Sequence, residues 1–141
     1  MIAESRAGAT GRALVLALLL GFTAAHAAPY RTIAQADTAA RSLLEVLVED
    51  GPEAALGRAR EASHLDDPRV QRNLAWARQG LPSRMRELGA PQSLETIGTD
   101  RFMSAFVRFS YRVRCARGDL RVMLTFRRKT DGWRLNQFYF D

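Results

Sequence analysis

Residues 101–141, RFMSAFVRFSYRVRCARGDLRVMLTFRRKTDGWRLNQFYFD, decide the fold of this chain. Between Met103 and Cys115 every odd-numbered residue is apolar or aromatic, and most even-numbered residues are arginine or serine. Side chains alternate between the two faces of a β-strand, so the pattern predicts a long strand with one buried face. From Leu120 to Phe126 the apolar residues occupy even positions, which predicts a second strand, and a third follows to Asp141.

Two tight turns separate these strands and predict their register. A Gly118-Asp119 turn suits the positive φ that the first position of a two-residue hairpin loop requires. The pairs that follow from this turn are Arg117 with Leu120, Cys115 with Val122, and Val113 with Leu124. The second turn spans residues 129–132 and pairs Arg128 with Trp133 and Phe126 with Leu135. The inward residues expected to pack against the first helix are Phe109, Tyr111, Val113, Val122, Leu124 and Leu135.

The alternation weakens after Leu135, where Gln137 falls on the buried row and Phe138 and Phe140 fall on the outer row. Three interpretations are open: the strand contains a bulge that turns the two phenylalanines inward, it is an edge strand, or the outer face of the sheet is itself covered. The residues expected on this outer face, as a docking or ligand surface, are Phe106, Arg108, Arg112, Arg121, Met123, Arg134, Phe138 and Phe140. A double change of Phe138 and Phe140 to serine would unfold the protein in the first case only.

Helices are expected over about residues 30–88, before the sheet of about residues 93–141, in which residues 93–98 suit a first, short strand. Apolar residues recur at helical spacing between Ile33 and Leu47, and Asp50-Gly51-Pro52 separates this helix from a shorter one. Asp67 and Pro68 predict the start of a third helix, which should stop at Gly80 and be followed by another turn or two up to Leu88. The sequence therefore predicts an α+β fold, with N-terminal helices packed on one face of a curved antiparallel sheet.

The first 27 residues have the organisation of a cleaved signal peptide. Arg6 and Arg12 precede the apolar run of residues 13–20, and an Ala25-His26-Ala27 motif follows. The run is much shorter than the roughly 20 residues that a membrane-spanning helix needs. Residues 28–141 should therefore form one periplasmic or secreted domain without a transmembrane anchor.

Charge is divided unevenly between the two halves of the domain. Residues 101–141 carry ten basic and three acidic side chains, whereas residues 28–100 carry nine basic and eleven acidic ones. The basic sheet half suits an anionic partner, although a solvated basic face is also consistent with it. Export argues against nucleic acid as that partner.

Few residues suit catalysis or metal binding. Cys115 is the single cysteine and lies on the apolar row, as expected of a buried hydrophobe. His64 lies near Asp66 and Asp67, which suits either an acid–base pair, half of a metal site, or a polar loop with a helix cap. We expect no metal site, no cofactor and no catalytic residue.

The order of elements resembles the nuclear transport factor 2-like superfold, also called cystatin-like, and exported bacterial domains of unknown function within it. The Leu88-Gly89 helix end, the strand around Tyr111 and the aromatic-rich residues 130–140 carry the resemblance, which covers most of residues 30–141. The resemblance implies a cone with an inner pocket, where Tyr111, Cys115 and Gln137 would lie. Enzymes of this superfold use acidic, Tyr or His side chains there, and the inward row has no Asp, Glu or His.

These observations predict an exported, non-catalytic binding domain. Its partner would be a protein, a second copy of the chain or a small anionic ligand, bound through the sheet face or through a pocket at Tyr111 and Gln137. Two alternatives remain open. One is a small cone-fold enzyme, isomerase-like or dehydratase-like, with Tyr111 and His64 near its pocket, and the other is a structural envelope protein.

Overall fold

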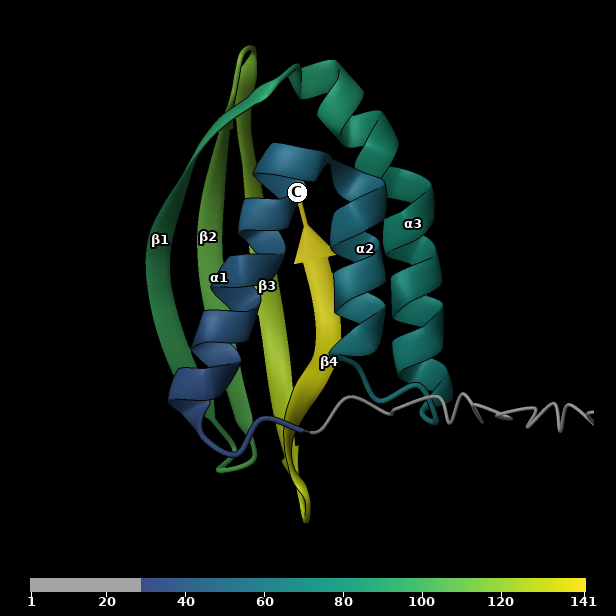
Figure 1. Ribbon diagram of the computed structural model, residues 1–141, viewed down its shortest axis with the longest axis vertical. Helices are drawn as coiled ribbons and strands as arrows, with labels where there is room; N and C mark the ends of the chain where they lie inside the picture. The colour runs from purple at the N-terminus through teal and green to yellow at the C-terminus, as the bar shows by residue number, and fades with distance from the viewer. Residues whose placement is uncertain (1–28) are drawn as a thin grey trace, which may run out of the picture.

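A computed structural model of the protein describes residues 29–141, so the segment assigned to the signal peptide lies outside the described residues. Three helices precede four strands, and the helices cover one face of a curved sheet that does not close on itself (Figure 1). The elements are α1 (Ile33–Asp50), α2 (Pro52–Glu61), α3 (Pro68–Leu88), β1 (Pro91–Phe102), β2 (Phe106–Cys115), β3 (Gly118–Lys129) and β4 (Gly132–Phe140). The strands are antiparallel in the order β1-β2-β3-β4, and the expected α+β fold class is confirmed.

The third helix is longer than the sequence predicts. Asp67 caps its start by accepting a hydrogen bond from the backbone N–H of Arg69 at 2.9 Å. The helix then continues through Gly80 and Pro82 instead of stopping. Gly80 is not a helix end but a point of close approach, because a Cβ there would lie 3.0 Å from Cζ of Phe140. Packing against β4 therefore explains the glycine.

The first strand is also longer than the expected segment of residues 93–98. It spans residues 91–102 and pairs with β2 along its length, with register shifts between Pro91 and Ser93 and between Thr96 and Gly98. The turn that follows occupies residues 103–105, so β2 begins at Phe106 rather than at Met103. Most β1 side chains are exposed, which explains why the strand lacks a clear apolar alternation.

The predicted register between β2 and β3 is wrong. Val113 pairs with Leu120 rather than with Leu124, and the loop consists of Ala116 and Arg117. Both registers bury the same row of side chains, so the alternation could not distinguish them. The observed loop is held by the end of α3, where the Arg117 backbone N–H donates to Leu88 O at 2.7 Å.

The register between β3 and β4 is confirmed as far as Leu135, which pairs with Phe126. A bulge at Asn136 then shifts the remainder of the strand, so that Phe138 and Phe140 face the core with exposed fractions of 0% and 8%. Their expected place on the outer face is wrong. Gln137 moves in the opposite direction, to the exposed outer face, so its expected place in an inner pocket is also wrong.

The expected core is confirmed. Six residues predicted to be buried have exposed fractions of at most 2%: Phe109, Tyr111, Val113, Val122, Leu124 and Leu135. They join one cluster with Ala36, Leu44 and other residues of α1. Every fully buried member of this cluster lies between residues 36 and 140. The described core therefore lies within the domain expected over residues 28–141.

The outer edge of β4 is covered at Trp133, Leu135 and Phe138, whereas the outer edge of β1 has no backbone hydrogen-bond partner among residues 29–141. The backbone of Tyr30 exchanges two hydrogen bonds with Trp133, and the α2–α3 loop bonds both backbone groups of Leu135. Farther along, the Asn73 side chain donates to Phe138 O at 3.0 Å and accepts from the Phe138 N–H at 2.7 Å. These contacts satisfy backbone groups that an edge strand otherwise presents to other chains.

Candidate ligand-binding cleft

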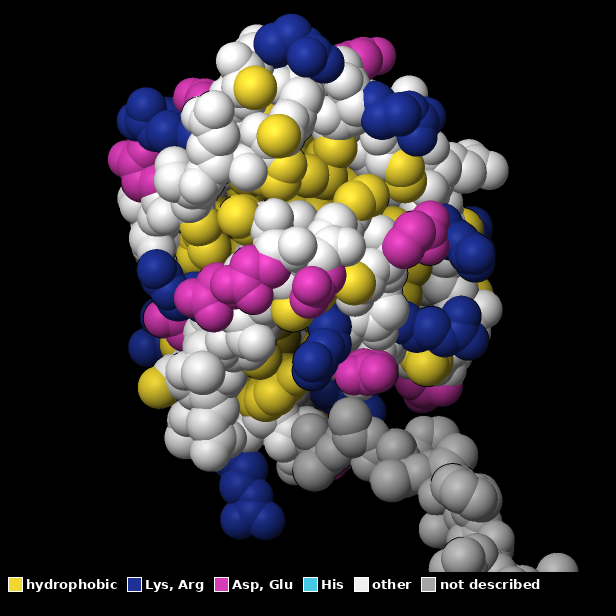
Figure 2. All heavy atoms as spheres, turned by 45° about the horizontal axis from the view of Figure 1, so that its top comes forward, with side chains coloured by type: hydrophobic (Ala, Val, Ile, Leu, Met, Phe, Trp, Pro, Cys, Tyr) yellow, Lys and Arg dark blue, Asp and Glu magenta, His cyan; other side chains and the backbone are white. Residues whose placement is uncertain are grey.

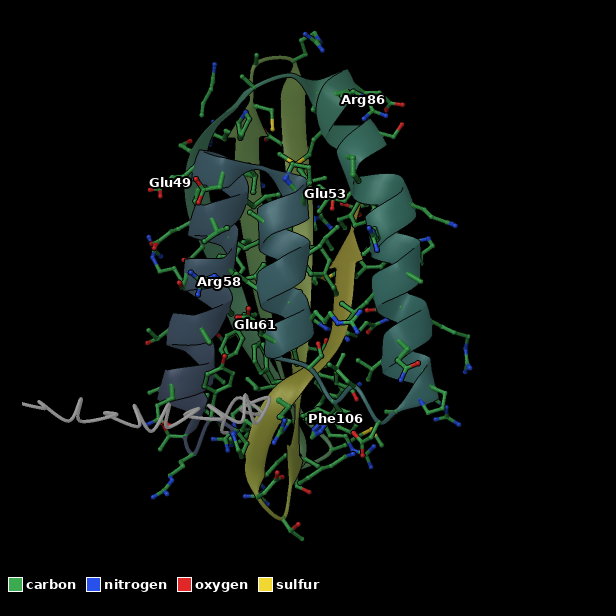
Figure 3. All side chains as sticks on the ribbon, turned by 45° about the vertical axis from the view of Figure 1, so that its right-hand side comes forward. Glu49, Glu53, Arg58, Glu61, Arg86 and Phe106 are labelled. Atoms are coloured by element: carbon green, nitrogen blue, oxygen red, sulfur yellow. The ribbon has the colours of Figure 1, made fainter. Side chains whose placement is uncertain are left out.

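The candidate site is a cleft of about 740 Å³ between the α2–α3 loop and the β3–β4 hairpin. It lies beside the covered edge of β4, where the loop bonds Leu135, near the end of the molecule to which Glu61 and Phe106 also belong (Figure 3). The lining residues are Arg60, Glu61, Ser63, His64, Leu65, Asp66, Lys129, Thr130, Asp131 and Arg134.

His64 is fixed in the wall of this cleft. Its backbone N–H donates to Leu135 O at 3.4 Å, and its carbonyl accepts from the Asp67 N–H at 3.2 Å. The residue is 5% exposed, and its Nε2 atom has no hydrogen-bond partner among the described residues. Burial lowers the pKa of His64, and the nearby cations of Lys129 and Arg134 lower it further, although carboxylates oppose this. The imidazole is therefore neutral at pH 7.

Arg134 provides a second buried polar atom without a partner in the part of the chain that the structure describes. Its guanidinium contacts a carboxylate oxygen of Asp131 at 3.2 Å, while its Nε–H is shielded from solvent and unpaired. The other two cations of the cleft, Arg60 and Lys129, take part in no ion pair among residues 29–141. Hydrogen-bond donors and uncommitted cations therefore meet at one cleft.

Ser63 does not present a free hydroxyl to the cleft. Ser63 is buried, and its hydroxyl donates to Ala59 O at 2.6 Å. This hydrogen bond directs the hydroxyl toward α2 rather than toward the His64 imidazole. Tyr111 does not line this cleft. Its hydroxyl donates to Asp37 Oδ1 at 3.1 Å, and burial next to this carboxylate raises the pKa of Tyr111. The structure thus does not bring Tyr111 and His64 together in one pocket.

Cys115 and Asp67 have structural roles, the first as a buried core residue and the second as a helix cap. Cys115 is buried, and burial raises the pKa of its thiol, so the thiolate is disfavoured. Asp67 caps the start of α3, which confirms the helix-cap alternative for this loop. Within residues 29–141, no group of three His, Cys, Asp or Glu side chains could hold a metal ion.

The outer face of the sheet retains part of the predicted surface. Arg108, Arg112 and Met123 are half-buried there, and Arg121 is exposed. A shallow groove of about 210 Å³ crosses this face, lined by Arg108, Met123, Thr125, Gln137 and Tyr139. Tyr139 and Gln137 thus occupy the place expected for Phe138 and Phe140.

Two arginines of the predicted outer-face set, Arg112 and Arg134, do not line this groove. Arg112 lies 3.7 Å from both Glu95 and Asp119, which neutralise it. Arg134 reaches the cleft at the edge of β4 instead of extending the sheet-face surface. Only part of the predicted outer-face set is therefore gathered in one place.

A second groove of about 540 Å³ runs between α2 and α3 and shares Arg60 and Leu65 with the cleft. Its polar lining residues, such as Glu53 and Arg78, are exposed to solvent. Neither of the two buried unpaired atoms belongs to a residue of this groove. We therefore place the candidate site in the cleft at His64.

The cleft residues were not grouped by the sequence. The sequence predicts only a turn for the segment that contains Lys129 and Asp131, and it places Arg134 on the sheet face. The isolated histidine was the one available signal, because a lone His that is neither a metal ligand nor a surface residue needs a partner in the fold.

No protein-family model matches the chain, and comparisons with curated proteins and with solved structures found no match. Among the described residues, no helix has the length and apolar character needed to cross a membrane.

Proposed function

We propose that the protein is an exported, non-catalytic domain that binds a small anionic ligand in the cleft between the α2–α3 loop and the β3–β4 hairpin. The observation that carries the proposal is the pair of shielded, unpartnered atoms there, Nε2 of His64 and Nε of Arg134. Buried polar groups are rarely left unpaired, because an unsatisfied donor costs about 1–3 kcal/mol. Oxygen atoms of a bound anion would supply the missing acceptors.

The chemistry of the lining favours an oxyanion or a carboxylate. A neutral imidazole protonated at Nε2 and the Nε–H of Arg134 both donate hydrogen bonds, and Lys129 and Arg60 add positive charge. Three carboxylates also line the cleft, of which Asp131 already pairs with Arg134. Specificity would therefore come from directed donors rather than from net charge.

Titration calorimetry with inorganic sulfate at low ionic strength tests this proposal. We expect Lys129→Gln and His64→Leu to weaken sulfate binding, the latter about 10-fold or more because it removes a buried donor. Arg108→Gln, a change on the outer sheet face, should bind sulfate as the parent does.

The pH dependence provides an independent readout, because sulfate keeps its charge between pH 5 and 8. A bound anion favours protonated His64, so binding by the parent should tighten as the pH falls, and His64→Gln should remove this trend. Loss of binding in Arg108→Gln, with the cleft variants unchanged, would move the ligand to the sheet face. No sulfate binding at all would contradict the proposal.

Periplasmic or secreted localisation and membership of the nuclear transport factor 2-like superfold are part of the same proposal. The export signal in residues 1–27 and the order of helices and strands support them. A non-catalytic role is favoured because the tyrosine and histidine of the enzyme alternative lie in different surroundings.

Docking of a protein partner, or self-association through the outer sheet face, is the second candidate. The groove beside Met123 and Tyr139 supports it, since apolar and aromatic side chains surrounded by arginines are typical of interface centres. Sedimentation of the parent and of Met123→Glu tests the self-associating form. A monomeric parent would contradict that form.

A further inference from the structure

The two hairpin turns at one end of the sheet form a single surface. We call residues 99–108 and 125–134 the hairpin end. The β1–β2 turn and the β3–β4 hairpin lie together at this end (Figure 1), and they are joined where the Arg128 N–H donates to Ala105 O at 2.8 Å. Phe106 pairs with Arg127 in the same region. The two turns are therefore in direct contact.

An apolar side chain projects from this end. Met103 is 78% exposed, the largest exposed fraction among the large hydrophobic residues. Met103 and Ser104 both have positive φ, at 51° and 48°, which is uncommon for residues other than glycine and costs of order 1 kcal/mol each. A strained turn that holds methionine in solvent is unfavourable for the isolated domain, which points to a binding partner for this side chain.

The two turns carry mainly positive charge. The hairpin end carries six cationic side chains, Arg101, Arg108, Arg127, Arg128, Lys129 and Arg134, against Asp100 and Asp131. Of these, only Arg134 forms an ion pair within residues 29–141. On the face that Figure 2 shows, by contrast, basic and acidic side chains are interspersed. The hairpin end is thus a concentrated basic surface.

Three of these arginines lie over aromatic rings, among them Arg128, whose guanidinium is 5.9 Å from the ring centre of Trp133. The guanidinium of Arg108 lies 5.0 Å from the ring centre of Phe102, and that of Arg127 lies 5.7 Å from the ring centre of Phe106. The two rings stack on each other at 5.3 Å. Cation–π contact fixes these charges at the hairpin end without neutralising them.

The chain also joins the domain at this end. Tyr30 pairs with Trp133, next to the β3–β4 turn, so the segment that precedes Pro29 connects here. That segment contains the apolar run of residues 13–20. Before cleavage, an export signal inserted in a membrane would hold this end close to lipid.

We propose that the hairpin end docks on an anionic lipid surface, with Met103 entering the headgroup region and the surrounding arginines contacting lipid phosphates. Basic side chains near an anionic bilayer contribute about fivefold each to partitioning, and an apolar side chain at the interface adds to this. The hairpin end shares Lys129, Thr130, Asp131 and Arg134 with the ligand cleft. Arg101, Met103 and Arg127 do not line the cleft, so changes at these three residues test the lipid surface separately.

Sedimentation with lipid vesicles tests the proposal on the chain that begins at Ala28. We expect binding to vesicles of phosphatidylcholine with phosphatidylglycerol, no binding to phosphatidylcholine alone, and weakening with salt. The double change Arg101→Gln and Arg127→Gln should lower partitioning about fivefold for each charge removed. Arg86→Gln, at the opposite end of the molecule (Figure 3), is the matched control. It should lower vesicle partitioning less than removal of one charge at the hairpin end does.

Two changes of Met103 separate a docking role from a structural one. Met103→Gly should weaken vesicle binding but keep or raise the melting temperature, because glycine accepts positive φ without strain. Met103→Trp should show a blue-shifted fluorescence increase on anionic vesicles only. Equal binding to both vesicle types, equal losses in Arg86→Gln and the hairpin-end variants, or parental binding by Met103→Gly would each overturn the proposal.

Discussion

Asn136 determines which aromatic side chains of β4 are buried. Because it is an extra residue in the strand, the side chains that follow it exchange faces. The sequence suggested a bulge as one possibility, since Gln137 on a buried row is unfavourable. It could not decide, because the outcome depends on Gly80 and Asn73 of α3, which accommodate Phe140 and bond Phe138.

Phe138 provides the corresponding test. Phe138→Ala should lower the free energy of unfolding by about 3–5 kcal/mol, because it leaves a cavity in a fully buried site. The neighbouring change Gln137→Ala, on the exposed face, should stay within about 0.5 kcal/mol of the parent. Urea denaturation measures both, and similar values for the two variants would contradict the observed bulge.

His64 makes stability depend on pH. Burial lowers its folded-state pKa below the unfolded value of about 6.5, so the unfolded chain binds a proton more readily. The stability that neutral His64 contributes is therefore complete above about pH 6.5 and is lost as the pH falls toward the folded-state pKa. His64→Gln should lose less stability than the parent between pH 7 and about pH 5 in urea titrations. Identical pH profiles would argue against this burial effect.

Strands with a strong alternation of apolar and polar residues could be predicted from the sequence. Loops and registers that depend on contacts between residues far apart in the chain could not. The apolar rows of β2 and β3 report the buried face directly. The β2–β3 loop depends instead on the end of α3, which bonds Arg117 from about thirty residues away in sequence. β1 gave a weak signal because, as an exposed edge strand, it buries few side chains.

Asn73 tests whether α3 holds the edge of β4. Asn73→Leu leaves the N–H and carbonyl of Phe138 without their side-chain partners, so we expect a loss of about 2–3 kcal/mol in stability. Amide hydrogen exchange should increase at Phe138. Arg72→Leu, an exposed change next to it in the helix, should leave exchange at Phe138 unaltered.

At the scale of the whole molecule, the fold class followed from the sequence, whereas the cleft did not. Periodicity specifies which faces are buried, and this is enough to predict helices on one side of an antiparallel sheet. The cleft combines residues 60–66 with residues 129–134, and no local pattern places these segments together. Only the paired loop and strand at Leu135 bring them into contact.

Export remains a prediction for the whole chain. We expect the mature protein to begin at Ala28 and to be recovered in the periplasmic or secreted fraction. N-terminal sequencing of the purified protein checks the cleavage site. Recovery of Met1 at the N-terminus would contradict it.

The unequal edges of the sheet limit how copies of this protein can polymerise. Strand-to-strand growth of a fibre requires each subunit to offer two free edges, one for the copy behind and one for the copy ahead. Here Tyr30, the α2–α3 loop and Asn73 occupy the edge of β4, so only β1 remains. A second molecule that pairs with β1 would consume the last free edge, and growth would stop at two subunits.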